Sequence, residues 1–258
     1  MRSSISSPGS PEPPALEVRG LTGPADRPII VDIDLLVRRG ETQVVLGPIQ
    51  CGKSMLMRHL LGLERAERGV VFVDGEEYDP TDGNDGLLRR LRTRIGAMFE
   101  GSALLTKLTA IENVELPLLE HTDVTAAEAR ETARELLAEV GMEIAGEVTP
   151  AELGRAARRR VALARALALR PAVLLLDEPT LGLDPHTAAE FDETLAALQP
   201  RHGFGVLIFS HEVRYAFGAV EHIYVMAEGT IVEHGDRDAI QHSGHPVVRQ
   251  LVDRRGHQ

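Results

Sequence analysis

One short loop carries residue types whose spacing is typical of a phosphate site. The stretch reads Gly47-Pro48-Ile49-Gln50-Cys51-Gly52-Lys53-Ser54 and is followed by Met55. It fits the pattern Gly-x-x-x-x-Gly-Lys-[Ser/Thr], with a strand-like apolar run before it and a helix-like run after it. In this arrangement backbone N–H groups and the helix dipole converge on one point, Lys53 adds a mobile positive charge, and the Ser54 hydroxyl reaches Mg²⁺. We therefore predict that residues 47–55 bind nucleotide phosphates, the alternative being a chance glycine-rich turn.

Further polar groups come after two apolar runs that are too short for helices. Asp177 and Glu178 follow residues 173–176, and His211 comes shortly after residues 206–209. Open α/β sheets bind ligands at the carboxyl ends of their buried strands, so these groups are expected beside the phosphate loop. Phosphoryl transfer to water needs Mg²⁺, a group that orients the water and positive charge on the phosphate. The sequence predicts Asp177 at the Mg²⁺, Glu178 at the water and His211 at the terminal phosphate; taken alone, each could instead be a turn cap or a core histidine.

The composition is that of an ordinary globular protein with one large or two small domains. The chain has 258 residues, 43% of them hydrophobic, and a net charge of −11, which argues against a general nucleic-acid surface. No run approaches the roughly 18 uninterrupted apolar residues of a membrane span, so a membrane role needs a partner. The single cysteine, Cys51, excludes an internal disulfide and fits a reducing compartment.

Local patterns indicate the elements that must hold these groups in place. Strands are expected at 15–18, 29–37, 43–46, 69–73, 95–99, 173–176 and 206–209, and hairpin turns at Asp74-Gly75 and Glu228-Gly229. From about 106 to 160 the pattern is helical, with a capping box at Thr125 and Glu128 and a helix stop at Gly141. Helices are also expected at 87–93 and 246–255. Residues 1–14 are predicted to form a disordered tail.

Four motifs surround the helical stretch in a specific order. They are Lys53-Ser54, Leu-Leu-Asp-Glu-Pro-Thr at 175–180, Gly-Leu-Asp-Pro at 182–185 and Ser-His-Glu at 210–212. Together they resemble the ATPase subunit of ABC transporters over roughly residues 15 to 240. The resemblance implies an α/β fold of the P-loop NTPase (RecA-like) kind, with a parallel-sheet core, an N-terminal antiparallel β subdomain and an inserted α-helical subdomain at about 106–160. Residues 241–258 would form a C-terminal helix and tail.

The resemblance also implies ligands and roles for particular residues. ATP and Mg²⁺ would be the cofactors, Glu178 the catalytic glutamate and His211 the switch histidine. The metal would be served by Ser54, Asp177 and Glu100. The D-loop would consist of Leu181, Gly182, Leu183 and Asp184.

Partners and location follow from the same resemblance. ABC ATPases work as head-to-tail dimers, so the expected partners are an integral-membrane permease and a second ABC ATPase subunit, identical or different, with no nucleic acid. The expected location is cytoplasmic, peripheral on the inner face of the cell membrane through the permease. A narrower likeness, in residues 99–106, 112–118 and 162–166, is to the ATPases of Mla and Mce-type systems, which indicates a lipid cargo.

The family signature Leu-Ser-Gly-Gly is altered in this chain. It is replaced by Leu153, Gly154, Arg155 and Ala156. Glycine allows a backbone to approach phosphate closely, so we expect Arg155 to impair the site that this segment completes in a partner. The alternative is that its guanidinium grips the phosphate as an arginine finger does. The three arginines at 158–160 are expected to be the solvated face of the next helix.

Three other departures bear on the nucleotide. Glu100 replaces the glutamine of the family's Q-loop, which would strengthen Mg²⁺ binding and add negative charge beside the triphosphate, with a net effect of either sign. Ile49 and Gln50 stand where Ser and Gly are usual and would strain the loop if a left-handed backbone is needed. Residues 20–27 contain no aromatic side chain to stack on adenine, so weak adenine affinity is expected.

Three functions remain open at this stage. The leading one is a transport ATPase that powers a permease. The second is a pseudo-ATPase, a catalytically impaired subunit of an ABC heterodimer, which the altered signature favours and the intact Glu178 and His211 oppose. The third is a soluble ABC protein outside transport, which the acidic charge and the single cassette disfavour.

Overall fold

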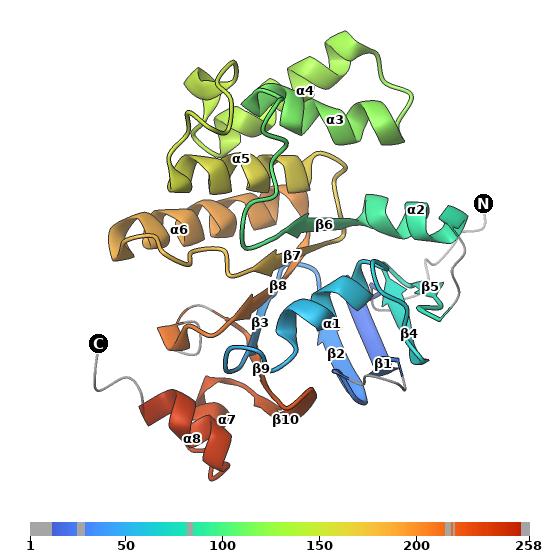
Figure 1. The fold of residues 1–258 in the computed structure, drawn as a ribbon, viewed down its shortest axis with the longest axis vertical. Coiled ribbons are helices and arrows are strands. Elements are labelled where there is room, and N and C mark those ends of the chain that lie inside the picture. The colour runs from blue at the N-terminus through green and yellow to red at the C-terminus, as the bar shows by residue number, and fades with distance from the viewer. Residues whose placement is uncertain (1–11, 25–28, 82–84, 215–217, 219, 254–258) are drawn as a thin grey trace, which may run out of the picture.

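The computed structural model describes residues 12–24, 29–81, 85–214, 218 and 220–253. A helical lobe covers one side of a strand-rich body, and the C-terminal helices pack at the opposite end (Figure 1). Most of the expected N-terminal tail, residues 1–11, and the last residues of the expected closing helix, 254–255, lie outside the described residues.

A six-stranded sheet with the order β10-β9-β3-β8-β7-β6 forms the centre of the body. Its strands are β3 (Thr42–Leu46), β6 (Ile95–Met98), β7 (Val173–Asp177), β8 (Gly205–Ser210), β9 (His222–Ala227) and β10 (Thr230–Gly235). All neighbours pair in parallel except β10, which forms the predicted antiparallel hairpin with β9. β3 pairs with both β8 and β9, so the strand that leads into the phosphate loop is central. The predicted α/β fold with a mainly parallel core is confirmed.

The central strands are buried on both faces, as the wholly apolar run at 173–176 predicts. In β7, Leu174 and Leu176 pack into one hydrophobic cluster, while Val173 and Leu175 pack into another on the opposite face. The first cluster includes the helical lobe, and the second includes the small sheet. Removing both faces from water is the main stabilising contribution, because apolar burial gives roughly 25 cal/mol per Å².

The small sheet is antiparallel, with the order β2-β1-β4-β5. Its strands are β1 (Leu16–Thr22), β2 (Ile33–Val37), β4 (Arg68–Val73) and β5 (Glu76–Tyr78). The predicted turn joins β4 to β5, with φ of 55° at Asp74 and 76° at Gly75, the left-handed pair that a tight hairpin requires. The predicted strand at 29–37 is wrong at its start, because Asp32 has a φ of 55° and extended pairing begins only at Ile33.

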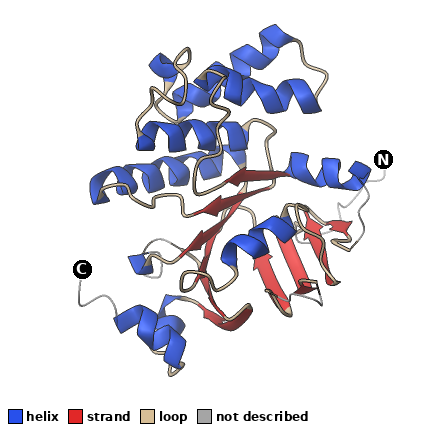
Figure 2. Ribbon diagram, viewed as in Figure 1, coloured by secondary structure: helices blue, strands red, loops and turns tan. Residues whose placement is uncertain are grey.

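Helices, drawn in blue in Figure 2, complete the described chain. They are α1 (Lys53–Leu60), α2 (Asp85–Arg94), α3 (Ala110–His121), α4 (Ala126–Glu139), the 3₁₀ helix η1 (Glu143–Ala145), α5 (Arg155–Leu167), α6 (Pro185–His202), α7 (Arg237–Gln241) and α8 (Pro246–Asp253). Helices α3, α4 and α5 pack on one another and form the predicted helical lobe, although α5 continues beyond residue 160.

The helical lobe shows how local sequence sets helix ends. Thr125 and Glu128 form the predicted capping box at the start of α4, and Thr109 and Glu112 form a second one at α3. Gly141, with a φ of 70°, follows the end of α4 as predicted. Each capping side chain satisfies amide groups that the helix leaves free, which is worth about 1 kcal/mol.

Candidate nucleotide-binding and hydrolysis site

The phosphate loop joins β3 to α1 and takes a shape that its glycines permit. A Cβ atom at Gly47 would lie 2.3 Å from the Met226 carbonyl oxygen, and Gly52 has a φ of 112°. Gln50 is left-handed, with a φ of 67°, so the expected strain falls on Gln50; Ile49 is not left-handed. The loop conformation therefore depends on two glycines and on one residue that glycine would suit better.

Lys53 begins α1 and lies against the loop. Its ammonium donates to the carbonyl oxygens of Gly47 (2.8 Å) and Pro48 (2.9 Å). Gly52, the N-cap residue of α1, offers no side-chain cap, so the first amide groups of the helix have no side-chain acceptor there. This combination of free amide donors and a nearby cation is what a phosphate group requires.

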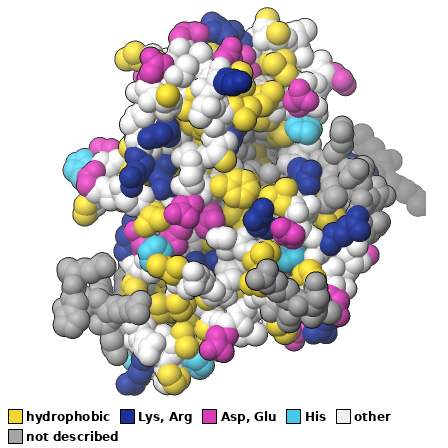
Figure 3. Space-filling model, viewed as in Figure 1, with side chains coloured by type: hydrophobic (Ala, Val, Ile, Leu, Met, Phe, Trp, Pro, Cys, Tyr) yellow, Lys and Arg dark blue, Asp and Glu magenta, His cyan; other side chains and the backbone are white. Residues whose placement is uncertain are grey.

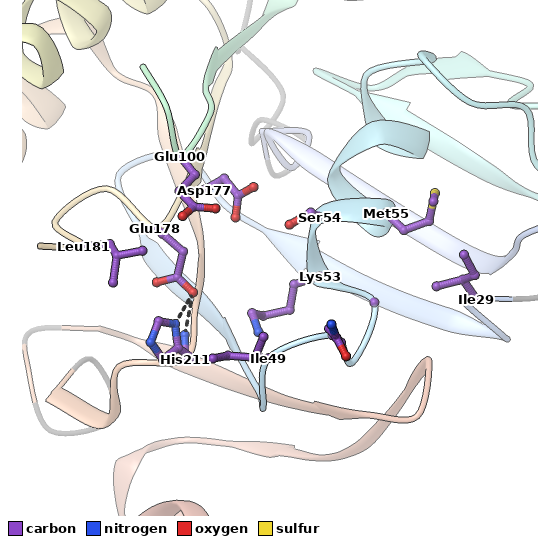
Figure 4. Close-up of a pocket in the computed structure, with 12 residues that line it drawn as sticks. Ile29, Ile49, Lys53, Ser54, Met55, Glu100, Asp177, Glu178, Leu181 and His211 are labelled. Atoms are coloured by element: carbon purple, nitrogen blue, oxygen red, sulfur yellow. Dashed lines mark hydrogen bonds and ion pairs between the residues drawn. The ribbon is translucent and has the colours of Figure 1, made fainter. Parts of the chain in front are cut away.

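A cavity of about 330 Å³ lies over this loop (Figure 4). It is lined by Ile29, Ile49, Gln50, Gly52, Lys53, Ser54, Met55, Glu100, Asp177, Glu178, Leu181 and His211. The polar groups predicted after β7 and β8, Asp177, Glu178 and His211, thus lie beside the phosphate loop. Figure 4 shows Ile29 and Met55 at one end and Glu178 and His211 at the other.

Glu178 is held by groups that follow β8. The Ser210 hydroxyl donates to its Oε2 at 2.7 Å, and the backbone N–H of His211 donates to its Oε1 at 2.9 Å. The Nδ1 atom of His211 lies 2.6 Å from the same Oε1. Because an ionised carboxylate only accepts, this contact places the imidazole proton on Nδ1. Glu178 also has a left-handed backbone, with a φ of 46°, so both its main chain and its side chain are specified by neighbours.

Asp177 lies beside Ser54 at the end of β7. Burial raises the pKa of the Asp177 carboxyl above its ordinary value, while a hydrogen bond from the Ser54 hydroxyl lowers it. The negative charges of Glu178 and Glu100 raise this pKa further, and Lys53 opposes them. The raised pKa of Asp177 therefore comes first from burial and only secondarily from the neighbouring carboxylates, and a bound cation would favour the charged carboxylate against both effects.

The oxygen donors fit a hard divalent cation that shares its ligands with phosphate. Ser54, Asp177 and Glu100 all line the cavity. Among the described residues, no group of three or more His, Cys, Asp or Glu side chains could hold a metal ion unaided. Mg²⁺ normally takes one or two protein ligands together with substrate phosphates and water, so the donor set agrees with that mode.

The segment predicted to be an altered signature, residues 153–156, does not line this cavity. Leu153 is buried, Gly154 is the N-cap residue of α5 and offers no side-chain cap, and Arg155 is the first residue of the helix. The guanidinium of Arg155 donates to the Gly182 carbonyl oxygen at 3.0 Å. Arg155 also lines a second cavity of about 400 Å³, together with Glu100, Gly101, Ser102, Arg158, Arg159 and Leu181. Within the described chain, the signature therefore contacts the loop after Glu178.

The D-loop residues have separate positions. Leu181 lines both cavities, and Gly182 is left-handed, with a φ of 71°. Asp184 caps α6, because its carboxylate accepts from the Thr187 backbone N–H at 3.1 Å. Hydrogen bonds from the Thr187 side chain and backbone lower the pKa of Asp184.

Two parts of the site escaped sequence reasoning. Ile29 was expected inside a strand, yet it lines the apolar end of the nucleotide cavity; an apolar residue just before an alternating run was the available signal. The expected solvated face of α5 is correct for Arg158 but wrong for Arg159, which is only 3% exposed. Arg159 donates to the carbonyl oxygens of Glu178 (2.7 Å) and Leu181 (2.8 Å), because buried carbonyl groups need donors.

The face seen in Figure 3 carries basic and acidic side chains intermixed, without one continuous basic surface. No helix in the described part of the chain combines the length and apolar character needed to cross a membrane.

Comparison with known proteins agrees with this geometry. Residues 30–181 match the family model described as "ABC transporter". The chain belongs to the ABC transporter family. The matched segment begins just before β2, includes the phosphate loop and Glu178, and ends at Leu181, so this ABC chain is an ATP-binding subunit of the ATPase cassette type.

Individual relatives and a solved structure extend the match. The ABC chain is 33% identical to the E. coli K12 "intermembrane phospholipid transport system ATP-binding protein MlaF", over 88% of this chain and 84% of MlaF. It is also 33% identical to the "probable ribonucleotide transport ATP-binding protein mkl" of Mycobacterium tuberculosis H37Rv, over 96% of this chain and 68% of mkl. The dimeric cassette MJ0796 bound to ADP and Pi superposes with a TM-score of 0.76 at 28% identity, covering 86% of this chain and 98% of that one.

Proposed function

We propose that this ABC cassette binds and hydrolyses Mg²⁺-ATP to power a membrane permease, through a single ATPase domain at residues 15–240. One observation carries the proposal. The fold brings Lys53 and Ser54 of the phosphate loop, Asp177 at the end of β7 and the Glu178–His211 pair into one cavity of about 330 Å³. These are the groups that phosphoryl transfer to water requires.

The residues that line the cavity have separate parts in the proposed reaction. Residues Gly47 to Met55 bind the phosphates through loop amides, and Lys53 exchanges its carbonyl partners for phosphate oxygens. Ser54, Asp177 and Glu100 would hold Mg²⁺, which supplies positive charge to the phosphates when bound.

The hydrolytic end of the cavity orients the water. Glu178 accepts a hydrogen bond from the attacking water, and its remaining partners keep the carboxylate from rotating. His211 is bound to Glu178 through Nδ1, and its Nε2 atom can donate to the terminal phosphate when both ring nitrogens carry a proton. The position of the carboxylate is therefore coupled to the position of the imidazole.

The altered signature supports a further part of the proposal, a division of labour between two subunits. In a head-to-tail pair, ATP bound by this chain meets the partner's signature, and ATP bound by the partner meets Leu153 to Ala156. Arg155 lies at the start of α5 and is bound to Gly182 of its own chain, which supports impairment of the partner's site. A heterodimer with an intact partner would then have one active and one mainly structural site.

A second candidate, the pseudo-ATPase, is favoured by one observation. Arg155 and Glu100 both line the second cavity, where the family has a glycine and a glutamine. If these changes stop turnover entirely, the chain would close on ATP without hydrolysing it. The intact Glu178 network is the observation against this candidate.

A lipid cargo is the finer part of the proposal. It is supported by the Mla-like residues at 99–106 and 112–118 and by the relative MlaF, whose name specifies phospholipid transport. At the same identity, mkl is named for ribonucleotide transport. Reconstitution with the co-encoded permease into vesicles that contain fluorescent phospholipid tests the cargo: ATP-dependent loss or gain of the lipid supports it, and transport of a nucleotide instead contradicts it.

Steady-state ATP hydrolysis tests the main proposal. We expect Mg²⁺-dependent turnover by the wild-type chain with its co-encoded partners, and a loss of about 100-fold or more in Glu178→Gln with ATP affinity retained. Equal rates in wild type and mutant would contradict the role of Glu178. Binding without turnover under every condition would favour the pseudo-ATPase. Recovery of the chain with membranes only when the permease is present would support the peripheral cytoplasmic location.

A further inference from the structure

The turn that follows Glu178 is held from α5 by two guanidinium groups. Arg159 donates to the carbonyl oxygens of Glu178 at 2.7 Å and Leu181 at 2.8 Å, and Arg155 donates to that of Gly182 at 3.0 Å. Residues 155 and 159 are four positions apart, so they lie on the same face of the helix. Three carbonyl oxygens within five residues therefore depend on α5 for their donors.

This turn has a backbone that requires such support. Glu178 is left-handed without being a glycine, with a φ of 46°, and Gly182 is left-handed at 71°. A conformation of this kind persists only where surrounding groups specify it. The Glu178 amide donates to the Phe209 carbonyl oxygen at 2.9 Å, and its carbonyl oxygen accepts from Arg159. The orientation of the peptide group after Glu178 is thus set by a side chain of α5.

The opposite side of the same turn is held by other residues. The Thr180 hydroxyl donates to Glu212 at 3.1 Å, and Arg214 donates to Thr180. Thr180 is buried, as is Arg159 on the other side. These residues hold the turn through the Thr180 side chain. The two arginines of α5 hold it through backbone carbonyl oxygens, so the two sets of hydrogen bonds are separate.

We infer that Arg159, assisted by Arg155, is a positioning residue for Glu178. The guanidinium fixes the peptide group that carries Glu178, and the carboxylate then meets Ser210 and His211 and faces the water. The inference rests on the proposed hydrolytic function, because a position for Glu178 matters to the rate only if Glu178 orients water. The two hydrogen bonds of Arg159 described above end on backbone oxygens, while the carboxylate is bound by Ser210 and His211.

Helix α5 reaches a second loop of the cavity in the same way. Arg165 donates to the carbonyl oxygens of Ser102 (3.0 Å) and Ala103 (2.7 Å), just after Glu100. Ser102 and Ala103 are also left-handed, with φ of 64° and 45°. Helix α5 therefore contacts both the backbone next to Glu100 and the backbone at Glu178.

The test compares Arg159→Met with Arg65→Met, a substitution of the same size at an exposed arginine in the loop after α1, which lines neither of the two cavities described above. We expect Arg159→Met to lower kcat about tenfold or more, with the Kd for ATP changed by less than about threefold. Arg159→Lys should recover part of the rate, because one ammonium replaces a two-pronged donor. Arg65→Met should match wild type.

Amide hydrogen exchange supplies a readout that does not depend on turnover. The Leu181 N–H donates to the Glu178 carbonyl oxygen and the Leu183 N–H to that of Thr180. Both should exchange about tenfold faster in Arg159→Met and remain unchanged in Arg65→Met. Unchanged exchange, or an equal loss of kcat in both variants, would overturn the inference.

The outcomes separate this inference from the proposed function. If the wild type binds ATP but never turns over, the hydrolytic function fails, and exchange at 181 and 183 still shows whether Arg159 sets the turn. If the wild type turns over and Arg159→Met changes neither exchange nor kcat, only the positioning role fails. If Arg159→Met does not fold, Arg159→Lys and Arg155→Met are measured instead, with smaller effects of the same direction expected and no effect in either contradicting the inference.

Discussion

Helices α1 and α5 begin alike and serve different places. Each starts after a glycine that offers no side-chain cap, and in each the first side chain is a cation that donates to carbonyl oxygens of a nearby loop. Lys53 of α1 lies in the nucleotide cavity of its own chain, whereas Arg155 of α5 lies in the neighbouring cavity. By contrast, α3 and α4 are closed by their own threonine caps.

The difference teaches how helix ends divide between structure and binding. At a capped helix N-terminus, a backbone N–H group of the first turn donates to the capping side chain. At an uncapped N-terminus these N–H groups can donate to another acceptor. At α1 that acceptor is the phosphate that this chain binds. At α5 it lies outside the nucleotide cavity of this chain, where a second subunit is proposed to bring its own ATP.

The largest expected effect separates the two cations. Lys53→Ala should weaken ATP binding by the isolated chain about 100-fold, because the mobile positive charge proposed to bind phosphate oxygens is lost. Arg155→Ala should leave the affinity of the isolated chain within about twofold, since Arg155 is outside that cavity. Calorimetric titration with a non-hydrolysable ATP analogue measures both. Equal losses would erase the distinction between the helices.

A second prediction concerns α5 in the assembly of two subunits. Arg155→Gly should raise turnover at the partner's ATP site about tenfold if the arginine obstructs the partner's phosphate, while turnover at the chain's own site falls as expected for Arg155→Met. The partner's own catalytic glutamate is mutated in a parallel sample, so that turnover at its site can be subtracted. A fall in rate at that site would instead assign Arg155 the role of an arginine finger.

The third prediction compares the two capping glycines themselves. Gly52 has a φ of 112° and its missing Cβ would meet Met226, whereas Gly154 has a φ of −65° and open space around it. Gly52→Ala should therefore lower the free energy of unfolding by about 1–2 kcal/mol. Gly154→Ser should change it by only a few tenths. Urea unfolding of both variants tests this, and a larger loss at Gly154 would contradict it.

The smallest expected effect is a pH dependence of stability and of Mg²⁺ affinity that comes from Asp177, which lies beside Ser54 of α1. Because the folded-state pKa of Asp177 is raised, mainly by burial, the folded chain binds this proton at higher pH than the unfolded chain. As pH falls from neutral toward the ordinary value of 3.8, this group therefore adds stability, while Mg²⁺ affinity falls as the carboxylate is neutralised. Asp177→Asn should remove both trends in that range. Mg²⁺ titrations and urea midpoints across pH measure them.

The sequence predicted the parts of the site that local pattern controls. The phosphate loop, the strand ends at Asp177 and His211, the hairpin at Asp74-Gly75 and the cap at Thr125 all follow from residue type and spacing within a few positions. Glu178 could be expected at the cavity because its strand is wholly apolar and therefore central.

The remainder depends on groups that are distant in sequence. Arg159 looks like one of three solvated arginines until the turn at 178–182, about 20 residues later, presents carbonyl oxygens to it. β2 begins four residues later than predicted because Asp32 has a left-handed backbone, which an alternating pattern of apolar residues does not reveal. Ile29 joins the cavity only through the packing of the small sheet against the phosphate loop.

The position of β3 between β9 and β8 limits when the nascent chain can assemble the nucleotide cavity. Leu46, at the mouth of the phosphate loop, pairs with Ser210 and with Val225, both of which are translated more than 160 residues later. The small sheet can form from residues 16–78, but the nucleotide cavity cannot be assembled until β8 and β9 have left the ribosome. During synthesis the complete nucleotide cavity therefore becomes available only after β8 and β9 have been translated and have paired with β3.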